Sequence, residues 1–582
     1  MSTEELLKEF PPVSTAAWEE AIHADLKGAD YASKLVWQSP EGIAVKPYYR
    51  AEDIASLPAL DAAPGVFPYL RGTRAEGGWL LREEIPVSDP EKANAQARAA
   101  VAAGAEQIAF TAAAIGNSSD LGLLLAGLDE IPVHFAAANE ALLALLAERL
   151  AHRAHAATVS AGWNPLQNPD FAAQLLASLP AQFLPFNVDA GIFEESGATT
   201  VEEVGLALAS GIDALAALSE RGIAADVAAG ALGFSFSIGS DFFFSIAKLR
   251  AFRLAWAQAV ESFGGSRQAA RARIAARTSR WNQALYDAHN NILRGTTEAL
   301  AAVLGGAEAI TVAPYDACFR EPGEASRRLA RNTQLILKQE AQLGRVADPG
   351  GGSYYLETLT SAIARKAWEL MQKIEGTGGY GKASAGGIVA GILAHSLGVR
   401  NKLVEQRRAV LTGVNQFVNA QERVLESIDP ALVDSTRRAA QPFERLRLRT
   451  ERHAKTTGKT PRVLLAETGD AKMRALRSQF AADFFACAGF ALVTQRFEDA
   501  QAIASADADL LVLCSSDPEY PALAAALLTA LQQAGRATPV IVAGNPGSAA
   551  ELKAAGVADF VHIRTNPLEF LTRWQQQLGV EA

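Results

Sequence analysis

The chain has 582 residues, a formal net charge of −10, 49% hydrophobic side chains and 20% charged side chains. This length exceeds what one hydrophobic core usually supports, so two or more domains are expected. The acidic balance argues against a nucleic-acid-binding protein, and no apolar run is long and uncharged enough to predict a membrane span.

The three cysteines, Cys318, Cys487 and Cys514, lie far apart in the chain and form no CxxC motif. This pattern predicts neither a disulfide framework nor a zinc site, and it favours a reducing, cytoplasmic location. The first ten residues, MSTEELLKEF, lack the apolar segment of an ordinary signal peptide. We therefore expect a cytoplasmic protein without metal ligands.

From about residue 105, short apolar or β-branched runs alternate with amphipathic helical segments. This alternation predicts a parallel sheet, and eight repeats favour a closed (β/α)8 TIM barrel over an open sheet. The expected strands are 107–111, 132–136, 157–161, 184–188, 232–238, 273–278, 309–313 and 345–348.

Several of these strands carry bulky side chains whose direction matters for function. The phenylalanines are Phe110, Phe135, Phe186, Phe234 and Phe236. Any of them that point inward would fill the channel of the barrel, and the register of the strands decides which do so. His134 also lies in a strand and is expected to be a buried, hydrogen-bonded histidine.

Residues 396–460 change character and become helical and charged. Between 431 and 460 there are eight Lys or Arg and three Asp or Glu, a local charge of +5 in an acidic chain. A solvated linker helix is the simpler interpretation of this pattern. The alternative is a strap that lies against an acidic protein surface.

Residues 461–582 restart the alternation of strands and helices. The expected strands are 462–467, 490–495, 508–515, 538–544 and 559–564. Five strands with helices between them predict a doubly wound, flavodoxin-like domain, whose ligands bind beyond the carboxyl ends of the strands. The first such loop is ETGDAKMRAL, which begins at Glu467.

Long segments, in the same order, resemble the adenosylcobalamin-dependent methylmalonyl-CoA mutase family. They are FFFSIAKLRAFRLAW (242–256), RWNQALYDAHNNILRGTTEALAA (280–302), RLARNTQLILKQEAQLGRVADPGGGSYYLETLT (328–360) and IARKAWELMQKIEGTGGY (363–380). The resemblance implies an N-terminal arm over 1–35, an acyl-CoA mutase-type barrel over 36–395, a helical linker over 396–460 and a cobalamin-binding-type domain over 461–582.

The C-terminal domain departs from the family at the cofactor loop. Catalytic chains of the family carry Asp-x-His-x-x-Gly there, and the histidine is the lower ligand of cobalt. Here Asp470 is retained, Lys472 stands at the histidine position and Ala475 at the glycine position. A protonated lysine has no lone pair for a metal, and SSDPEY (515–520) and AGNPG (543–547) keep only fragments of the family's later cofactor motifs. The resemblance therefore implies a degenerate domain without cofactor-binding residues and no cofactor on this chain.

The barrel departs from the family in the same way. A Tyr-His pair lies at the reacting thioester in catalytic chains, but Gly191 and Ile192 occupy these two positions here. Neither side chain can donate a hydrogen bond, so no catalytic residue is expected. Glu194 and Glu195 follow directly, and adjacent residues of an extended segment point apart, which argues against an acid/base pair.

The family includes heterodimers in which a larger chain carries adenosylcobalamin and performs the chemistry, while a smaller homologous chain lacks the active site. This sequence resembles the smaller chain. The resemblance implies a non-catalytic structural subunit of a heterodimeric methylmalonyl-CoA mutase, which interconverts (R)-methylmalonyl-CoA and succinyl-CoA by radical rearrangement. The larger catalytic subunit is the expected partner, with no nucleic acid and no membrane. Two alternatives remain: a degenerate barrel that binds or senses an acyl-CoA without turnover, and a mutase that uses unrecognised substitutes.

Overall fold

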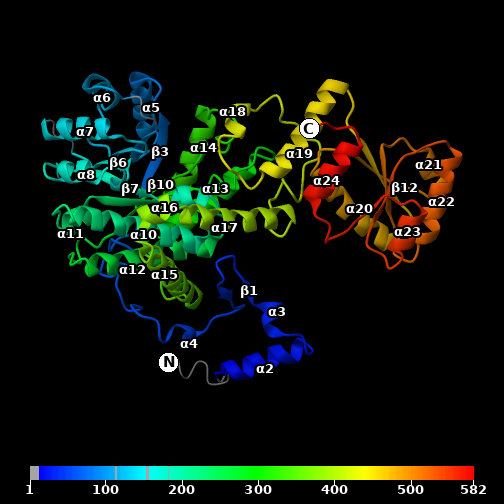
Figure 1. Cartoon of the computed structure of the whole chain (residues 1–582), viewed down its shortest axis with the longest axis horizontal. Helices are drawn as coiled ribbons and strands as arrows, with labels where there is room; N and C mark the ends of the chain where they lie inside the picture. The colour runs from blue at the N-terminus through cyan, green and yellow to red at the C-terminus, as the bar shows by residue number, and fades with distance from the viewer. Residues whose placement is uncertain (1–11, 112–114, 153–155, 181, 582) are drawn as a thin grey trace.

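The computed structural model describes residues 12–111, 115–152, 156–180 and 182–581. Figure 1 shows the chain passing from an N-terminal arm into a barrel, then through a linker into a separate C-terminal domain. The first eleven residues of the arm predicted over 1–35 lie outside the described residues. The rest of the arm and its connection to the barrel contain α2 (Thr15–Asp25), α3 (Tyr31–Leu35), β1 (Trp37–Gln38), β2 (Ala44–Val45) and α4 (Ala51–Ile54).

Eight parallel strands close into a barrel in the order β10-β3-β4-β5-β6-β7-β8-β9, which confirms the predicted fold. The strands are β3 (Leu80–Pro86), β4 (Gln107–Thr111), β5 (Val133–Phe135), β6 (Val159–Trp163), β7 (Phe183–Asp189), β8 (Leu232–Ile238), β9 (Arg273–Thr278) and β10 (Ala309–Thr311). Parallel neighbours need a crossover connection, and helices supply it here. The helices between the strands include α5 (Pro90–Ala102), α6 (Ser118–Leu124), α7 (Glu140–His152), α8 (Pro169–Leu176), α10 (Thr200–Ser219), α12 (Phe242–Ser262) and α13 (Asn290–Leu304), and α14 (Glu324–Leu335) follows the last strand.

One barrel strand differs from the sequence prediction. The strand expected over 345–348 is wrong, because these residues end a short 3-10 helix, η3 (Leu343–Arg345), and continue as a loop. The first barrel strand is instead β3, in which buried Leu81 and Ile85 alternate with Arg82 and Glu84. Arg82 and Glu84 on one face of β3 and Glu83 on the other interrupt its apolar pattern, so the sequence shows no apolar run there.

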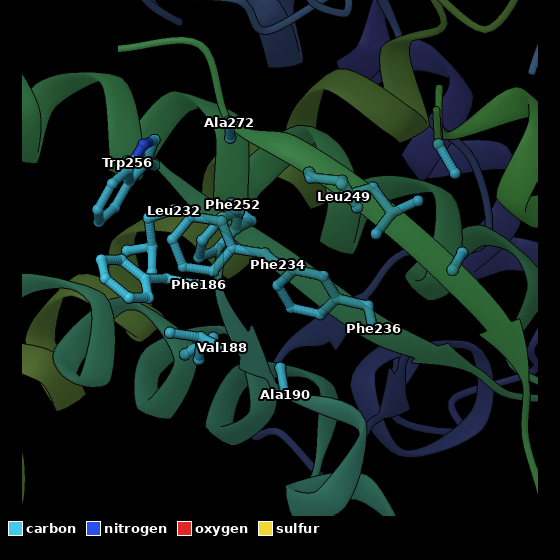
Figure 2. Packing of buried hydrophobic residues seen from close by; sticks show 14 of the residues in the cluster. Phe186, Val188, Ala190, Leu232, Phe234, Phe236, Leu249, Phe252, Trp256 and Ala272 are labelled. Atoms are coloured by element: carbon cyan, nitrogen blue, oxygen red, sulfur yellow. The ribbon is translucent and has the colours of Figure 1, made fainter. Parts of the chain in front are cut away.

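The five strand phenylalanines point away from the barrel axis. Figure 2 shows Phe186, Phe234 and Phe236 in the layer where Phe252 and Trp256 of α12 pack against the strands. The ring centroids of Phe234 and Phe252 are 4.5 Å apart, and those of Phe236 and Phe252 are 4.9 Å apart.

On the other side of the barrel, Phe110 and Phe135 contact each other at 5.8 Å between centroids. Side chains alternate between the two faces along a strand. Gln107 and His134 face the lumen, so Phe110 and Phe135 on the same two strands face away from it. The register of the strands, which the sequence left open, thus turns all five phenylalanines away from the channel.

Helices α15 (Tyr354–Glu375), α16 (Tyr380–Ala385) and α17 (Ile388–Glu405) follow the barrel, and α15 packs against α10 and α12. Arg250 of α12 is fully buried and pairs with Asp348, while its Nη2 lies 2.7 Å from Glu357 Oε2. Arg71 reaches the same two carboxylates at 3.1 and 3.3 Å. This buried ion-pair cluster joins the loop before α15 to the outer wall of the barrel.

The linker differs from its simpler interpretation. Helix α19 (Gln441–Thr457) is buried along one face, including Phe443 and Arg447, so a solvated linker helix is wrong. The guanidinium of Arg447 lies 3.7 Å from the ring centroid of Tyr286, and Leu446 O accepts a hydrogen bond from Gln575 of the C-terminal domain. The helix thus packs between a barrel loop and the C-terminal domain, against an aromatic ring rather than an acidic surface.

The C-terminal domain is a five-stranded parallel sheet in the order β12-β11-β13-β14-β15, the predicted doubly wound fold. Its strands are β11 (Arg462–Glu467), β12 (Ala491–Arg496), β13 (Leu510–Cys514), β14 (Val540–Ala543) and β15 (Asp559–Val561). Its helices are α20 (Ala471–Ala486), α21 (Ala500–Ser505), α22 (Tyr520–Gln533), α23 (Ala549–Ala555) and α24 (Pro567–Gln577). Successive residues of β11 enter two different cores, one on each face of the sheet, as helices on both sides require.

Candidate functional site

The first predicted site lies at the carboxyl end of β7, where the short helix α9 (Gly191–Glu195) begins. Ile192 is 50% exposed and has no polar group to offer. Gly191 is buried, and a Cβ atom at this position would overlap the guanidinium of Arg277 from β9. The space that a side chain at residue 191 would need is therefore occupied by Arg277.

Arg277 is held in this place by two carboxylates. Its Nη1 lies 2.8 Å from Asp189 Oδ1 and its Nη2 lies 3.2 Å from Glu195 Oε1. Burial disfavours the charged guanidinium, but Asp189 and Glu195 outweigh this effect and raise the pKa of Arg277. The top of the barrel thus carries a closed ion-pair network instead of an open pocket at this strand.

Glu194 and Glu195 point apart, as expected, although they lie on a helix rather than on an extended segment. Glu194 is buried and accepts hydrogen bonds from the hydroxyls of Ser237 and Ser279, and it pairs with Arg400 at 3.0 Å. Both carboxylates are therefore engaged in separate structural contacts.

Polar side chains fill the lumen nearer the amino ends of the strands. Arg82 Nε donates to Gln107 Oε1 at 2.9 Å, and His134 Nδ1 lies 2.9 Å from Ser160 Oγ. Burial, and then the charge of Arg82, hold the pKa of His134 well below its usual range, so it is a buried, hydrogen-bonded, neutral histidine as expected. A cavity of about 220 Å³ remains at this level.

Because Arg277 fills the space beside Gly191, a tyrosine at residue 191, the side chain that the resemblance predicts for a catalytic chain, should destabilise the barrel. We expect Gly191→Tyr to lower the free energy of unfolding by about 1–3 kcal/mol, because the added atoms must displace the paired Arg277 from a packed site. Chemical denaturation measures the effect. Ile192→His is the control, since a half-exposed position should change stability by less than about 0.5 kcal/mol. Equal stability of Gly191→Tyr and wild type would show that the site is open.

The second predicted site is the loop between β11 and α20. Asp470 is the N-cap of α20, where its Oδ1 accepts a hydrogen bond from Met473 N at 2.8 Å. Lys472 and Ala475 are both exposed on the first turns of the helix. The retained aspartate thus has a structural role that needs no cofactor.

Glu519 occupies the crevice between β11 and β13, the point where strand order reverses. Its Oε2 lies 2.6 Å from the hydroxyls of both Ser515 and Ser516, and it accepts hydrogen bonds from Ser516 N and from Asp470 N at 3.2 and 3.1 Å. A Cβ atom on Gly469 would overlap this carboxylate. One side chain of the chain itself therefore bridges the two loops at the place where ligands of such sheets bind.

Two further side chains fill the adjoining space. Tyr520 is fully buried, and its hydroxyl donates to Ala543 O at 2.6 Å. Arg477 pairs with Asp517 at 2.9 Å and lies against Gly544. These residues close the carboxyl edge of β13 and β14.

A family model described as methylmalonyl-CoA mutase matches residues 38–121 and 173–482. This chain belongs to the methylmalonyl-CoA mutase family. It is 36% identical to the methylmalonyl-CoA mutase small subunit of Porphyromonas gingivalis over 99% of both chains, and 32% identical to that of Streptomyces virginiae over 99% and 98%. It is also 32% identical to the methylmalonyl-CoA mutase of Cereibacter sphaeroides, over 71% of this chain and 65% of that protein.

The mutase family uses cobalamin, and the residues around the family's cofactor loop in this chain do not fit that group. Lys472, at the position predicted for the cobalt ligand, is exposed, and the crevice behind it is filled by Glu519 and Tyr520. Sequence comparison with the family marks Lys472 but not Glu519. The sequence does contain a signal for the role of Glu519. Hydroxyls near a carboxylate indicate a local hydrogen-bond network, and Ser515 and Ser516 precede Glu519 closely.

The structure does not bring the two predicted sites together. Helix α9 packs against α10 and β8 in the barrel, whereas α20 packs on the sheet of the C-terminal domain. Within the described ranges, no group of three or more His, Cys, Asp or Glu is arranged to hold a metal ion. Nor does any helix described there have the length and apolarity that a membrane crossing needs.

Glu519 should make the stability of the C-terminal domain sensitive to acid. Hydrogen bonds from the Ser515 and Ser516 hydroxyls, then from Asp470 N, lower the pKa of Glu519 to about 2. A carboxylate with a lowered folded-state pKa contributes stability above its unfolded pKa and loses it as pH falls toward the folded value. The stability difference between wild type and Glu519→Gln should therefore be complete above about pH 4.5 and vanish near pH 2. Thermal melts across this range measure it, with exposed Glu551→Gln as control; a difference that does not vary with pH would contradict the contacts.

Proposed function

We propose that this chain is the non-catalytic, structural subunit of a heterodimeric methylmalonyl-CoA mutase that depends on adenosylcobalamin. The observation that carries the proposal is the filled crevice of the C-terminal domain. The carboxylate of Glu519 receives its hydrogen bonds from both ligand loops, and Tyr520 is buried behind it. A cofactor tail would have to displace these groups, and the fully buried Ser515 would then lose the partner of its hydroxyl.

The barrel supports the same proposal. Gly191 and Ile192 supply no hydrogen-bond donor at the family's Tyr-His positions, and the paired Arg277 takes up the adjoining space. We propose that no catalytic residue, cofactor-binding residue or metal ligand lies on this chain. The isomerase activity of the family, the interconversion of (R)-methylmalonyl-CoA and succinyl-CoA, would then belong to the complex and not to this chain alone.

The proposed partner is a larger, homologous catalytic chain that carries adenosylcobalamin. Two relatives that match this chain over nearly its full length bear the name small subunit, which supports an assembly of two unequal chains. The N-terminal arm offers a contact surface, since α2 buries no residue and Trp18 is about half exposed, as is Trp37 directly after the arm. Large exposed aromatic side chains are typical of interface anchors.

We also propose the division into arm (1–35), barrel (36–395), linker (396–460) and degenerate cobalamin-binding-type domain (461–582), although α17 continues across residue 395. The cytoplasm is the proposed location, supported by three buried cysteines without a disulfide partner.

The test is reconstitution of the mutase reaction. This chain, the larger homologous chain of the same organism, and their mixture are each supplied with adenosylcobalamin and methylmalonyl-CoA, and the formation of succinyl-CoA is measured. We expect no turnover by this chain alone and turnover in the mixture. Turnover by this chain alone would overturn the proposal.

A further inference from the structure

A cavity of about 380 Å³ opens at the carboxyl ends of β3 and β10. One wall is α14 and another is the short linker helix α18 (Pro430–Val433), which Figure 1 shows beside each other at one end of the barrel. The loop after β9 supplies a third wall through Gln283. We call this cavity the rim pocket. Its volume lies in the range of small-molecule sites and is far too small for a coenzyme A thioester.

One part of the rim pocket is apolar. Its apolar lining consists of Val312, Pro314, Ala317, Ala330 and Leu432. These residues come from the loop after β10, from α14 and from α18, so an apolar body placed here would contact the barrel and the linker together.

Another part of the pocket carries polar groups without partners. Gln283 and Thr311 are 7% and 6% exposed and line the cavity, yet neither side chain makes a hydrogen bond to the residues that the structure describes. Arg327 Nη1 donates to Pro322 O at 2.6 Å, but its buried Nε has no hydrogen-bond partner within the described ranges. Buried polar groups are normally satisfied, so the buried Nε of Arg327, which faces the same cavity as the uncommitted side chains of Gln283 and Thr311, points to a ligand.

The charges of the pocket favour an anion. Its charged lining consists of Arg82, Arg280, Arg327 and Arg331, against Glu83, Glu84 and Glu321. Arg331 and Glu83 neutralise each other at 2.6 Å. Arg280 and Arg327 have only long contacts with carboxylates, 4.0 Å to Glu195 and 3.9 Å to the exposed Glu324, so their guanidinium groups are the cations most available to an anion.

We propose that the rim pocket binds a small amphipathic anion, with its apolar body on Val312, Ala330 and Leu432 and its anionic group at Arg327, Gln283 and Thr311. The proposal goes beyond the function proposed above and does not depend on it, because the pocket uses none of the residues at the family's catalytic or cofactor positions.

The test uses two fluorescent probes of the same shape. 1-Anilinonaphthalene-8-sulfonate is an anion with an apolar body, and N-phenyl-1-naphthylamine is its neutral analogue. The full-length chain should bind one sulfonate saturably, and octanoate should displace it. Arg327→Met should weaken binding of the sulfonate about 10-fold or more and leave the neutral analogue unchanged, because a charge-assisted hydrogen bond is lost.

Two more variants test whether the probe binds in the rim pocket. Ala330→Phe fills the apolar part and should weaken both probes at least about 10-fold, since overlap with a packed ring removes the space they occupy. Arg328→Met changes the exposed neighbour of Arg327 on the same helix and should change neither. Equal effects of Arg327→Met and Arg328→Met would overturn the proposal. So would a crystal structure that places the probe on the exposed apolar groove of Phe417, Leu476 and Ile563 instead of in the rim pocket.

Discussion

Replacing Arg250 by methionine is expected to lower the free energy of unfolding of the barrel by about 3–5 kcal/mol, the cost of breaking a buried ion pair by removing one partner. Arg250 is fully buried and pairs with Asp348 and Glu357, which are themselves buried. After the substitution, Arg71 alone would face two carboxylates in a site that excludes water. Urea unfolding followed by the fluorescence of the barrel tryptophans measures the loss.

The matched control is Arg365→Met. Arg365 lies on α15, is 70% exposed and pairs with Glu369 at 3.9 Å. An exposed pair of this kind contributes about 0–1 kcal/mol. Similar losses for the two variants would show that the buried cluster does not hold α15 to the barrel.

The second large effect concerns cobalamin. Lys472→His introduces a histidine at the position predicted for the cobalt ligand, yet we expect the affinity of this variant for hydroxocobalamin to stay at least about 100-fold below that of the proposed catalytic partner, a deficit of about 2.7 kcal/mol or more. The reason is steric: Glu519 and Tyr520 fill the crevice, and Ala475 adds a methyl group at the family's glycine position. Visible absorption during titration reports both binding and histidine ligation.

Lys553→His controls for cobalamin captured by any surface histidine, because Lys553 is exposed on α23 of the same domain. Weak binding of equal strength by the two variants is the expected result. Tight binding by Lys472→His alone would mean that the crevice is open and that one substitution had removed the cofactor. The account of a filled crevice would then be wrong.

The sequence patterns that predicted the fold correctly were those in which apolar residues form short runs. Strands β4 to β10 and all five strands of the C-terminal domain have such apolar runs. The ends of each strand lie within a few residues of the predicted ends. β3 has no such run, because Arg82 and Glu84 face the lumen. Residues 345–348 were predicted as a strand from their composition, but Val346 is exposed and no described strand pairs with it.

The linker and the two sites show where local pattern is insufficient. The positive charge of α19 indicated solvent, but Arg438 just before the helix pairs with the nearby Glu444, and Arg447 lies over the ring of Tyr286, which is far away in the sequence. The sequence alone predicts departures from the family at Gly191, Ile192, Lys472 and Ala475. It does not predict their replacement partners, Arg277 and Glu519, because only the folded strands bring them to those positions.

The most direct test of the central claim is the native mass and cobalamin content of this chain, purified gently from its own organism. We expect a one-to-one complex with a larger homologous chain that contains one cobalamin, and no cobalamin on this chain after the two are separated. A homo-oligomer of this chain that retains cobalamin would contradict this claim.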